Sequence, residues 1–419
     1  MILIGLALIL LALFGAPLFV IVSASALIGF YHADIPLMAF ANEFYRIADM
    51  PILLAIPLFT FAGYLLSESE APGRLVRLTR ALFGWVPGGL AIIALMACAM
   101  FTAFTGASGV TIIALGALLY PALAEAGYDE KFNLGLITSA GSLGLLFAPS
   151  LPLILYGVVA EISIDQLFIA GVLPGMLMLV LLGGWSVWSN RSIRVPLGSF
   201  SWSEAGAALW ESIWEIPLPF VVLGGIYSGY FAVSEAAAVT ALYVLIVEVL
   251  IRREVSLQRL PSVMRESMVL VGGIMVILGA SLASTNVMID AQIPQKLVGF
   301  VEQYVSSPLT FQLLLLLFLL VLGAILDIFS ALVLVVPLIL PVAAQYGMHP
   351  MHLGIVFLAT MQLGYLTPPI GLNLFISSYR FEKPITQVYL STIPFFLILL
   401  ISVLIITFLP ALSLVFLGE

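Results

Sequence analysis

Charge is what this chain has least of. Only 9% of its 419 residues are Asp, Glu, Lys or Arg, whereas 63% are hydrophobic. A soluble protein carries roughly 25% charged residues, so this chain has too few charges to cover a water-soluble globule. Its apolar runs are also too long and too continuous for the alternating strands of an outer-membrane barrel. The composition therefore predicts a helical protein that crosses a membrane several times.

Cysteine and phosphate-binding motifs are equally scarce. The single cysteine, Cys98, lies in an apolar run and excludes an intramolecular disulfide. No Gly-Lys pair occurs, so the chain lacks a Walker A motif and is not expected to hydrolyse ATP itself. A channel would have a continuous polar or charged pore lining, which the apolar segments do not show. Coupling to an ion gradient is the energy source that remains.

Residues suited to covalent catalysis are few as well. The segment 106–109 reads GASG and fits the G-x-S-G pattern of an intramembrane serine protease. That chemistry needs a base, usually histidine, beside the serine. The topology predicted below places His32, His349 and His352 on the outer side, whereas the hairpin that carries the serine opens from the inside. An enzyme is therefore not expected.

Two stretches with the same pattern of glycine and proline organise the chain, at 102–157 and 322–377. A shift of 220 positions places Pro121, Gly127, Gly144 and Pro149 on Pro341, Gly347, Gly364 and Pro369. Because glycine and proline mark changes of backbone direction, one offset shared by four of them indicates an internal repeat. Apolar segments that are interrupted at matching places in two halves of a membrane protein are typical of a transporter's binding site.

The membrane spans follow from length, since crossing the hydrocarbon core takes about 20 apolar residues. Nine stretches meet this need: 3–29, 50–67, 131–160, 167–188, 214–230, 233–251, 266–285, 352–378 and 386–412. Glycine and proline interrupt two of these stretches, 131–160 and 352–378. Two further stretches, 87–126 and 308–345, have no charged loop at the middle and predict either re-entrant hairpins or pairs of full spans. The segments 71–83, 201–215 and 292–304 are amphipathic and are predicted to lie at the interface.

The placement of Lys and Arg predicts the orientation. If both long stretches are hairpins, 12 of the 14 basic residues fall on one side, and only Arg46 and Lys296 fall on the other. The positive-inside rule then places the N-terminus inside and the C-terminus outside. Helix pairs would give the same bias, but the small residues at 106–109 favour a hairpin tip buried in protein. The predicted units are an inverted repeat at 1–190, a linker with an interfacial helix and an extra span at 191–232, and a second inverted repeat at 233–419.

The interruptions are the candidate sites. At the first hairpin tip, TGASG at 105–109, glycine allows close backbone approach, and hydroxyls add neutral oxygens suited to Na⁺; a tight helix contact through small residues is the alternative. Carbonyls freed in the two breaks, 139–152 and 362–373, are tolerated at membrane depth only when buried or facing a water-filled cavity. A simple proline kink is the alternative there. The recurrence of the break in both halves favours a site.

Two carboxylates stand out. Asp327, in the second hairpin, has apolar runs on both sides, and an ionisable group inside the membrane is a functional candidate. It would either ligate a cation or cap the helix that follows, since Asp is a preferred N-cap. Glu235 follows Ser234, the expected N-cap of its helix, where the helix dipole favours a carboxylate. Its expected role is structural.

Several motifs resemble those of a known family: TGASG, GSLGLLFAPSLPLILYG, SEAAAVTALY, and LGAILDIFSALVLVVPLILP followed by LGYLTPPIGLNLF. It is the large membrane subunit (M subunit, DctM-like) of tripartite ATP-independent periplasmic (TRAP) transporters, and the resemblance covers nearly the whole chain. It implies an all-α polytopic membrane protein of two inverted repeats, each with a re-entrant helical hairpin and a broken transmembrane helix, in an elevator-type ion-transporter fold. This sequence departs from the family in having Ala148-Pro149 where a double proline is usual, and in a hairpin tip with less serine.

The resemblance also implies function and partners. The chain would import an organic acid, a carboxylate such as a dicarboxylate, with Na⁺ as the coupling ion and no cofactor, in a bacterial or archaeal cytoplasmic membrane. Its partners would be a small TRAP membrane subunit and a periplasmic substrate-binding protein, with no role for nucleic acid. A related divalent-anion/Na⁺ symporter that works without a binding protein is the alternative, and a channel or intramembrane enzyme is a distant third.

By match to the family pattern, the resemblance assigns the site residues. The cation ligands would be Gly106, Ser108, Ser142 and Gly144 at one Na⁺ site, and Asp327, Ser330, Gly364 and Thr367 at the other. The substrate would lie near Ser150, Gln362 and Asn373. Since no arginine is expected in this core, a carboxylate would depend on hydroxyls, amides, helix N-termini and bound cations.

Overall fold

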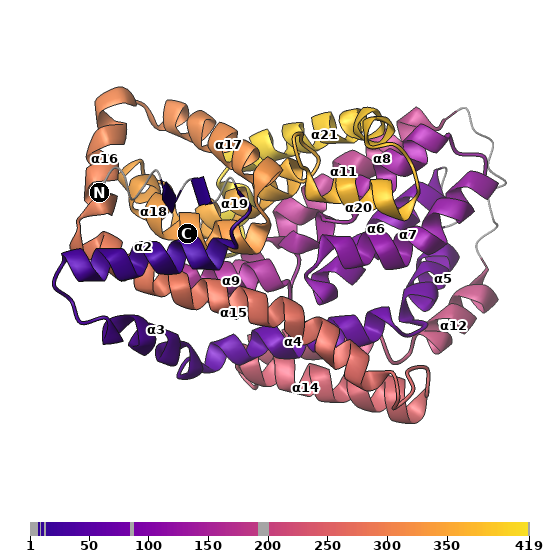
Figure 1. Ribbon diagram of the computed structural model, residues 1–419. Helices are drawn as coiled ribbons and strands as arrows, with labels where there is room; N and C mark the ends of the chain where they lie inside the picture. The colour runs from indigo at the N-terminus through magenta and orange to yellow at the C-terminus, as the bar shows by residue number, and fades with distance from the viewer. Residues whose placement is uncertain (1–6, 9, 12–13, 84–87, 192–200, 418–419) are drawn as a thin grey trace.

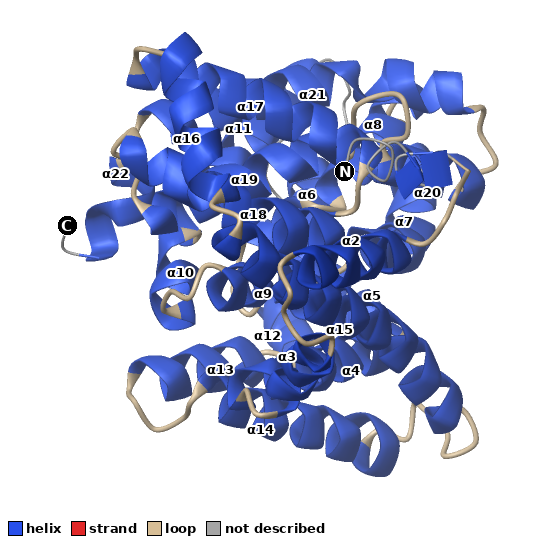
Figure 2. Ribbon diagram, turned by 60° about the vertical axis from the view of Figure 1, so that its left-hand side comes forward, coloured by secondary structure: helices blue, strands red, loops and turns tan. Residues whose placement is uncertain are grey.

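The computed structural model describes residues 7–417, except 9, 12–13, 84–87 and 192–200. Within these residues all regular secondary structure is helical, and Figure 2 shows the helices joined by short loops. Seven described helices are long and apolar enough to cross a membrane, or up to nine if each bent helix pair counts as one span. The prediction of an all-α polytopic membrane protein is therefore confirmed.

The helices of the first half are α2 (Leu18–His32), α3 (Met38–Ala48), η1 (Pro51–Leu54), α4 (Ala55–Ser67), α5 (Ala71–Phe83), α6 (Gly89–Thr105), α7 (Ser108–Glu125), α8 (Glu130–Ala140), η2 (Leu143–Leu146), α9 (Leu151–Val159), α10 (Ile164–Ala170) and α11 (Val172–Ser189). The chain continues through α12 (Trp202–Glu211), α13 (Pro217–Tyr227), α14 (Val233–Leu245), η3 (Ile246–Ile251), α15 (Leu260–Asp290) and α16 (Ile293–Tyr304). It ends with α17 (Pro308–Ile325), α18 (Ile328–Gln345), α19 (Pro350–Gly364), α20 (Leu372–Arg380), α21 (Ile385–Phe408), α22 (Ala411–Leu414) and η4 (Val415–Leu417).

The helices form two groups (Figure 1). In the lower part of that view α4 packs against α14 and α15, and α15 packs against α2 and α3. Above them lie the two helix pairs α6–α7 and α17–α18 with the broken spans α8–α9 and α19–α20. The groups meet where α4 contacts α6 and α9 and where α15 contacts α18. The first broken span therefore contacts the lower group through α9, whereas α19 and α20 of the second pack against helices outside the lower group.

Both long apolar stretches form helix–turn–helix units. Their second helices, α7 and α18, have 18 residues each and begin 220 positions apart. At the first turn Thr105, Gly106 and Ser108 are buried, as the small-residue cluster predicted. The second turn, at Leu326 and Asp327, contacts the second break through backbone hydrogen bonds described below. The first turn therefore lies inside the protein, as in a re-entrant hairpin, whereas Asp327 of the second turn is exposed.

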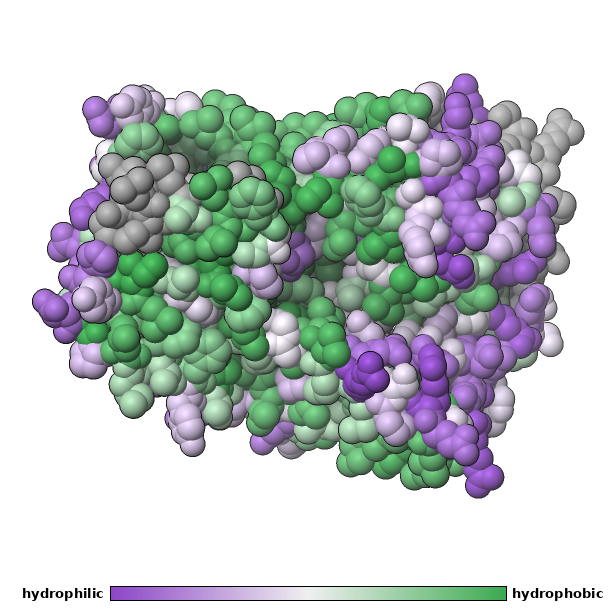
Figure 3. Space-filling view, viewed as in Figure 1, coloured by the Kyte–Doolittle hydropathy of each residue, from purple (hydrophilic) through white to green (hydrophobic). Residues whose placement is uncertain are grey.

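The surface has a broad apolar zone between two polar ends. Figure 3 shows hydrophobic residues across the middle of this face and hydrophilic residues at its left and right edges. In the matching view of Figure 1, α5 and α12 lie at the right edge and α16 at the left edge. Exposed large apolar side chains such as Leu317, Phe220 and Leu390 would be costly in water. The distribution is that of a protein surrounded by lipid tails.

Four local predictions were wrong. Residues 3–6, 9 and 12–13 of the predicted span 3–29 lie outside the described part of the chain, and the span is interrupted before Leu18, because Gly15 has a positive φ of 84° and Pro17 cannot continue a hydrogen-bonded helix. Helix α3 was missed because its apolar residues alternate with polar ones, and it meets the following helix at a bend of 64° before Pro51. The predicted span 214–230 is only the 11-residue α13, from Pro217. The N-cap of α14 is Ala232, not Ser234.

The correction at α14 has a clear cause. The Glu235 carboxylate accepts a hydrogen bond from the Ala232 backbone N–H at 2.9 Å. This bond starts the helix at Val233 and leaves Ser234 inside the first turn. Glu235 is thus structural, as predicted. The amphipathic segments 71–83, 201–215 and 292–304 form α5, α12 and α16 within one to four residues of the predicted ends.

Close helix contacts in this fold depend on glycine, and one pair of variants tests that. A Cβ at Gly135 of α8 would lie 2.2 Å from the Ser391 carbonyl oxygen of α21, whereas a Cβ at Gly184 of α11 would have nothing within 4 Å. We expect Gly135→Ala to destabilise the protein by about 1–3 kcal/mol through overpacking. Gly184→Ala should change stability by less than about 1 kcal/mol, in the favourable direction. Thermal unfolding in detergent measures both, and equal melting temperatures would contradict the α8–α21 contact.

Candidate ion and substrate site

The first break leaves backbone carbonyls without helical partners. Helix α8 ends at Ala140, a short 3₁₀ turn follows at Leu143–Leu146, and α9 begins at Leu151 after a cis Ala148–Pro149 bond. The Thr102 hydroxyl of α6 lies 2.9 Å from the Gly141 carbonyl oxygen, within hydrogen-bonding distance. The first hairpin therefore brings a hydroxyl close to the break, although the single proton of that hydroxyl is also within reach of the Cys98 carbonyl oxygen at 2.8 Å and the Thr111 hydroxyl oxygen at 2.7 Å.

Glycine brings hairpin and break into backbone contact. Gly106 has a φ of 64°, and a Cβ there would lie 2.5 Å from the Leu151 side chain. A Cβ at Gly144 would lie 2.2 Å from the Ala99 carbonyl oxygen and 2.5 Å from the Ala103 backbone nitrogen. Close packing through small residues, the alternative left open by the sequence, is thus present at both glycines. Their role as cation ligands stays a prediction.

Hydroxyl oxygens without partners gather at this hairpin tip and break. The side-chain oxygens of Thr105, Ser139, Ser142 and Ser150 are buried and have no hydrogen-bond partner. A buried polar group left without a partner costs about 1–3 kcal/mol. Neutral oxygens of this kind are the donors that a hard cation such as Na⁺ accepts, so the residues fit such an ion. Ser108, the other predicted hydroxyl ligand, is also buried in this region.

Two of these hydroxyls were not in the predicted ligand set. Ser139 lies in the last turn of α8 and Ser142 lies after the helix ends, so their common burial depends on the break. Thr105 adjoins Gly106 at the hairpin tip. Ser150 was predicted for the substrate. Ser150 is buried and adjoins Leu151, which packs against Gly106 at the hairpin tip. Its hydroxyl therefore belongs to the group of oxygens at the first break.

Asp327 caps the second hairpin helix. One carboxylate oxygen accepts the backbone N–H groups of Phe329 and Ser330, each at 3.0 Å. The other accepts the Ser330 hydroxyl. The N-cap alternative is therefore what the structure shows, and a cation-ligand role stays a prediction. The Asp327 side chain remains exposed on the protein surface and is still accessible to an ion.

The second hairpin tip is joined to the second break by backbone groups. The N–H groups of Ile370 and Gly371 each donate to the Ala324 carbonyl oxygen at 3.2 Å. The Ile328 N–H donates to the Tyr365 hydroxyl at 2.7 Å. A Cβ at Gly364 would lie 2.6 Å from the Gly323 backbone, so these glycines also pack backbone to backbone.

The two breaks differ in exposure. Pro149 and Ser150 of the first break are buried, whereas the range 368–370 of the second break is exposed and Thr367 is half-buried. The Thr367 hydroxyl donates to the Leu363 carbonyl oxygen at 3.2 Å. The second break also contains a cis bond, Pro368–Pro369, 220 positions after that of the first. The first site is thus closed within protein and the second is open.

The predicted substrate residues contact different helices. The Gln362 amide nitrogen lies 2.7 Å from the Met178 sulfur of α11. The Asn373 amide nitrogen donates to the Thr138 carbonyl oxygen of α8 at 3.2 Å. The amide oxygens of both residues are buried without a partner. Both amides therefore keep a free acceptor atom, and their direct convergence with Ser150 on one ligand stays a prediction.

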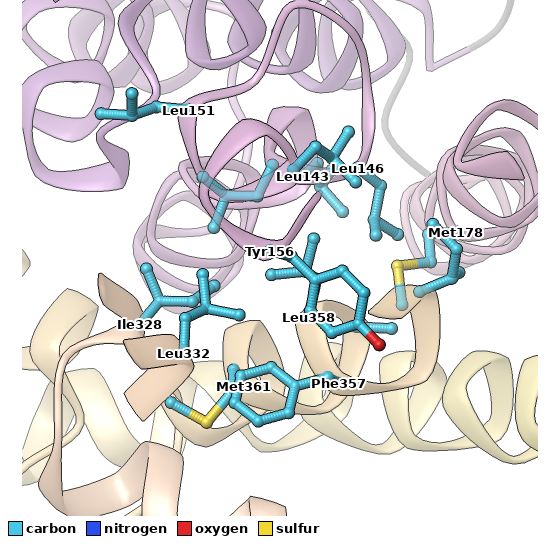
Figure 4. Packing of buried hydrophobic residues seen from close by; sticks show 14 of the residues in the cluster. Leu143, Leu146, Leu151, Tyr156, Met178, Ile328, Leu332, Phe357, Leu358 and Met361 are labelled. Carbon is cyan, nitrogen blue, oxygen red and sulfur yellow. The ribbon is translucent and has the colours of Figure 1, made fainter. Parts of the chain in front are cut away.

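An apolar core fixes the two broken spans relative to each other. Figure 4 shows Tyr156 of α9 among Leu143 and Leu146 of η2 and Phe357 of α19. The Tyr156 hydroxyl donates to the Pro350 carbonyl oxygen at 2.7 Å. Its ring lies against Gly354, where a Cβ would be 2.5 Å away. The ends of the two half-helices are therefore held by packing rather than by charge.

A polar cavity of about 200 Å³ separates α15 from α9 and α18. Its polar lining residues are Arg46, Glu161, Ser281, Thr285 and Asn286. At its wall the Ser281 hydroxyl of α15 donates to the Val333 carbonyl oxygen of α18 at 2.7 Å. The sequence reasoning missed this cavity because it used Arg46 only as a marker of orientation.

The histidines do not support a protease. His32 contacts the Ile28 carbonyl oxygen, and His352 contacts the Ser413 hydroxyl and the Thr407 carbonyl oxygen. His349 caps α19 by accepting the Met351 N–H. None of these contacts involves Ser108.

Comparisons with known proteins agree with this geometry. The family model described as "Tripartite ATP-independent periplasmic transporter, DctM component" matches residues 2–412. The C4-dicarboxylate TRAP transporter large permease protein DctM of Pseudomonas aeruginosa is 34% identical over 375 residues, which cover 89% of this chain and 88% of that protein. The ectoine/5-hydroxyectoine TRAP transporter large permease protein UehC of Ruegeria pomeroyi is 32% identical over 415 residues, 96% of this chain and 95% of that one.

A solved structure shares the fold. The YdaH transporter of Alcanivorax borkumensis superposes with a TM-score of 0.63 at 13% identity, covering 89% of this chain and 87% of that one. The matched relatives are transporter permeases and not enzymes. The chain belongs to the tripartite ATP-independent periplasmic (TRAP) transporter family and is its DctM component, a large permease subunit.

Proposed function

We propose that this permease subunit imports an organic acid by Na⁺-coupled secondary transport with an elevator mechanism. The observation that carries the proposal is the set of buried hydroxyl oxygens without partners at the first hairpin tip and break, on Thr105, Ser142 and Ser150. Each such oxygen costs about 1–3 kcal/mol while it lacks a partner, and a bound Na⁺ would provide one for several of them together. The second ion would use the exposed Asp327 with Ser330 and Thr367.

The chemistry of the substrate follows from what surrounds the breaks. No arginine or lysine occurs in the hairpin tips and breaks, 102–112, 139–152, 322–332 and 362–373. A carboxylate there would depend on bound cations and on the free amide oxygens and hydroxyls acting with helix N-termini. Relatives named for a C4-dicarboxylate and for ectoine support a small carboxylate as the substrate class.

Partners and orientation follow from the family. A tripartite system implies a small membrane subunit and a periplasmic binding protein, so the chain would work in a cytoplasmic membrane. We propose that the end carrying α5 and α12 faces the cytoplasm. Ion pairs of this end, Arg77–Glu211, Arg259–Glu68 and Lys383–Glu130, join its helices and loops, consistent with its excess of basic residues.

The elevator is supported by the grouping of the helices. The hairpins and broken spans form one packed group and α2, α3, α4, α14 and α15 another. The polar cavity and the Ser281–Val333 hydrogen bond lie between them. Because this contact surface contains a cavity and few hydrogen bonds, one group of helices could slide along the other at a low free-energy cost.

Uptake into proteoliposomes tests the coupling. We expect radiolabelled succinate or ectoine to enter when an inward Na⁺ gradient is present and a binding protein and the small subunit are added. A K⁺ gradient should give no uptake above empty liposomes. Uptake that needs Na⁺ but no binding protein would favour the related symporter, and uptake that is equal in both gradients would contradict Na⁺ coupling.

Single hydroxyls test the ion site. Ser142→Ala removes an oxygen predicted to face the ion, so we expect the half-saturating Na⁺ concentration for uptake to rise about tenfold, or ~1.4 kcal/mol. Ser186→Ala is the matched control, because the Ser186 hydroxyl of α11 is likewise buried without a partner but lies outside the breaks. A similar Na⁺ dependence of both variants would place the ion elsewhere.

A cross-link tests the elevator. In a Cys98→Ala background, cysteines at Ser281 and Val333 would join α15 to α18, and we expect uptake to stop on oxidation and return on reduction. Cysteines at Tyr120 and Phe381, whose rings stack at 4.7 Å within the hairpin group, are the control and should leave uptake unchanged. Full uptake by the joined Ser281–Val333 pair would show that α15 and α18 keep their positions during transport.

A further inference from the structure

A buried charge cluster lies away from the ion and substrate sites. Arg74 of α5 contacts Glu215, which precedes α13, at 2.6 Å, and Glu248 of η3 at 3.5 Å. It also pairs with Glu254, in the loop after η3. The exposed fractions of the four side chains are 5% for Arg74, 5% for Glu215, 1% for Glu248 and 17% for Glu254. We call these four residues the Arg74 cluster.

The cluster has too few positive charges. Three carboxylates face one guanidinium, so full ionisation would leave two uncompensated negative charges in a buried place, which is strongly unfavourable. Of the neighbouring arginines, Arg77 pairs with the Glu211 carboxylate, whereas Arg252 donates to the neutral Glu211 carbonyl oxygen and its Nε has no partner. Among the described residues Tyr243 of α14 also lies near Glu248, and its hydroxyl donates to the Trp214 carbonyl oxygen.

Two members of the cluster are held in their charged forms. Burial opposes the charge of Arg74, but its bonds to Glu254 and the nearby charge of Glu215 outweigh this and raise its pKa. Burial alone would raise the pKa of Glu254, but the hydrogen bonds from Arg74 and from the Glu70 N–H lower it. The Glu70 N–H donates to the second Glu254 oxygen at 2.8 Å. With Arg74 and Glu254 charged, a proton bound by the cluster would be held at Glu215 or Glu248.

The geometry favours Glu248. It is the most buried of the three carboxylates, although Glu215 and Glu248 each have one buried oxygen without a hydrogen-bond partner. At 3.5 Å it is also farther from the guanidinium than Glu215. Glu248 and Glu254 both contact the Arg74 guanidinium, and two neighbouring carboxylates can share a hydrogen bond only if one of them carries a proton. Among the described residues no group of acidic, histidine or cysteine side chains has the arrangement of a metal site.

We propose that the Arg74 cluster is a proton-binding site, in which Glu248 carries a proton at neutral pH and donates it in a hydrogen bond to Glu254. This inference is independent of the proposed transport function. The site joins α5 to the end of α14, and α5 leads directly into the first hairpin. Loss of the proton at alkaline pH would set two carboxylates against each other and weaken the attachment of α5.

Infrared spectroscopy of the purified full-length chain tests the site without a transport assay. We expect a protonated-carboxyl C=O band at neutral pH that disappears as the pH is raised. The band should be missing in Glu248→Gln, which keeps the shape and donor of a protonated glutamate, and should persist in the control Glu204→Gln on the exposed face of α12. No such band in the wild-type chain, or its loss in Glu215→Gln but not in Glu248→Gln, would overturn the assignment.

Thermal unfolding against pH gives a second readout. If the folded chain holds a proton that the unfolded chain has lost, its stability falls as the pH rises from about 4.3, the ordinary pKa of glutamate, to the pH at which the folded chain loses that proton. Glu248→Gln carries no such proton, so its melting temperature should change less over that pH range than that of the wild-type chain or of Glu204→Gln. Equal pH slopes for all three proteins would contradict a proton held by Glu248.

Discussion

Interrupted helices inside a membrane need protein partners for their backbone groups, and the rest of this structure follows from that need. The hydrocarbon core offers no hydrogen bonds, so each break lies against a hairpin tip. Thr102 lies within hydrogen-bonding distance of a carbonyl oxygen of the first break, and Ala324 accepts two N–H groups of the second. Glycines at both contacts allow backbones to approach at distances that a Cβ would prevent.

The two halves apply this constraint differently. The first break is enclosed and has hydroxyls in place of charges, several of them without partners. The second is open, and its hairpin begins with a carboxylate that caps a helix. Repeated backbone geometry therefore coexists with different side-chain chemistry. Sites of unequal exposure and charge can bind their ligands with unequal affinity, which suits a protein that must bind on one side of a membrane and release on the other.

Charge is rare in the hairpin tips and breaks. The breaks and tips contain a single carboxylate, Asp327, whereas the ion pairs and the Arg74 cluster lie at the ends of helices. A buried cluster with more carboxylates than arginines is stable only if it binds a proton or a cation. Its position at the joint between α5 and α14 links the ionisation of a few residues to the attachment of a helix that precedes the first hairpin.

The sequence alone determined the class of the protein, the repeat and the positions of the interruptions. Length and hydrophobicity are local properties, and glycine and proline limit the backbone wherever they occur. Gly106, Gly144, Gly364 and Pro369 therefore mark the hairpin tip and the breaks by residue type and spacing alone. The ends of α5 and α16 were predicted closely for the same reason, because amphipathic patterns are local.

Only the tertiary structure decided which groups meet. Packing buries the Thr105 and Ser139 hydroxyls and gives the Gln362 and Asn373 amides different partner helices. It also brings Glu215, Glu248 and Glu254 around Arg74, although these residues are distant in the chain. A single sequence carries no record of such contacts. Whether a polar side chain is satisfied depends on its neighbours in space, and those are set by how the helices pack.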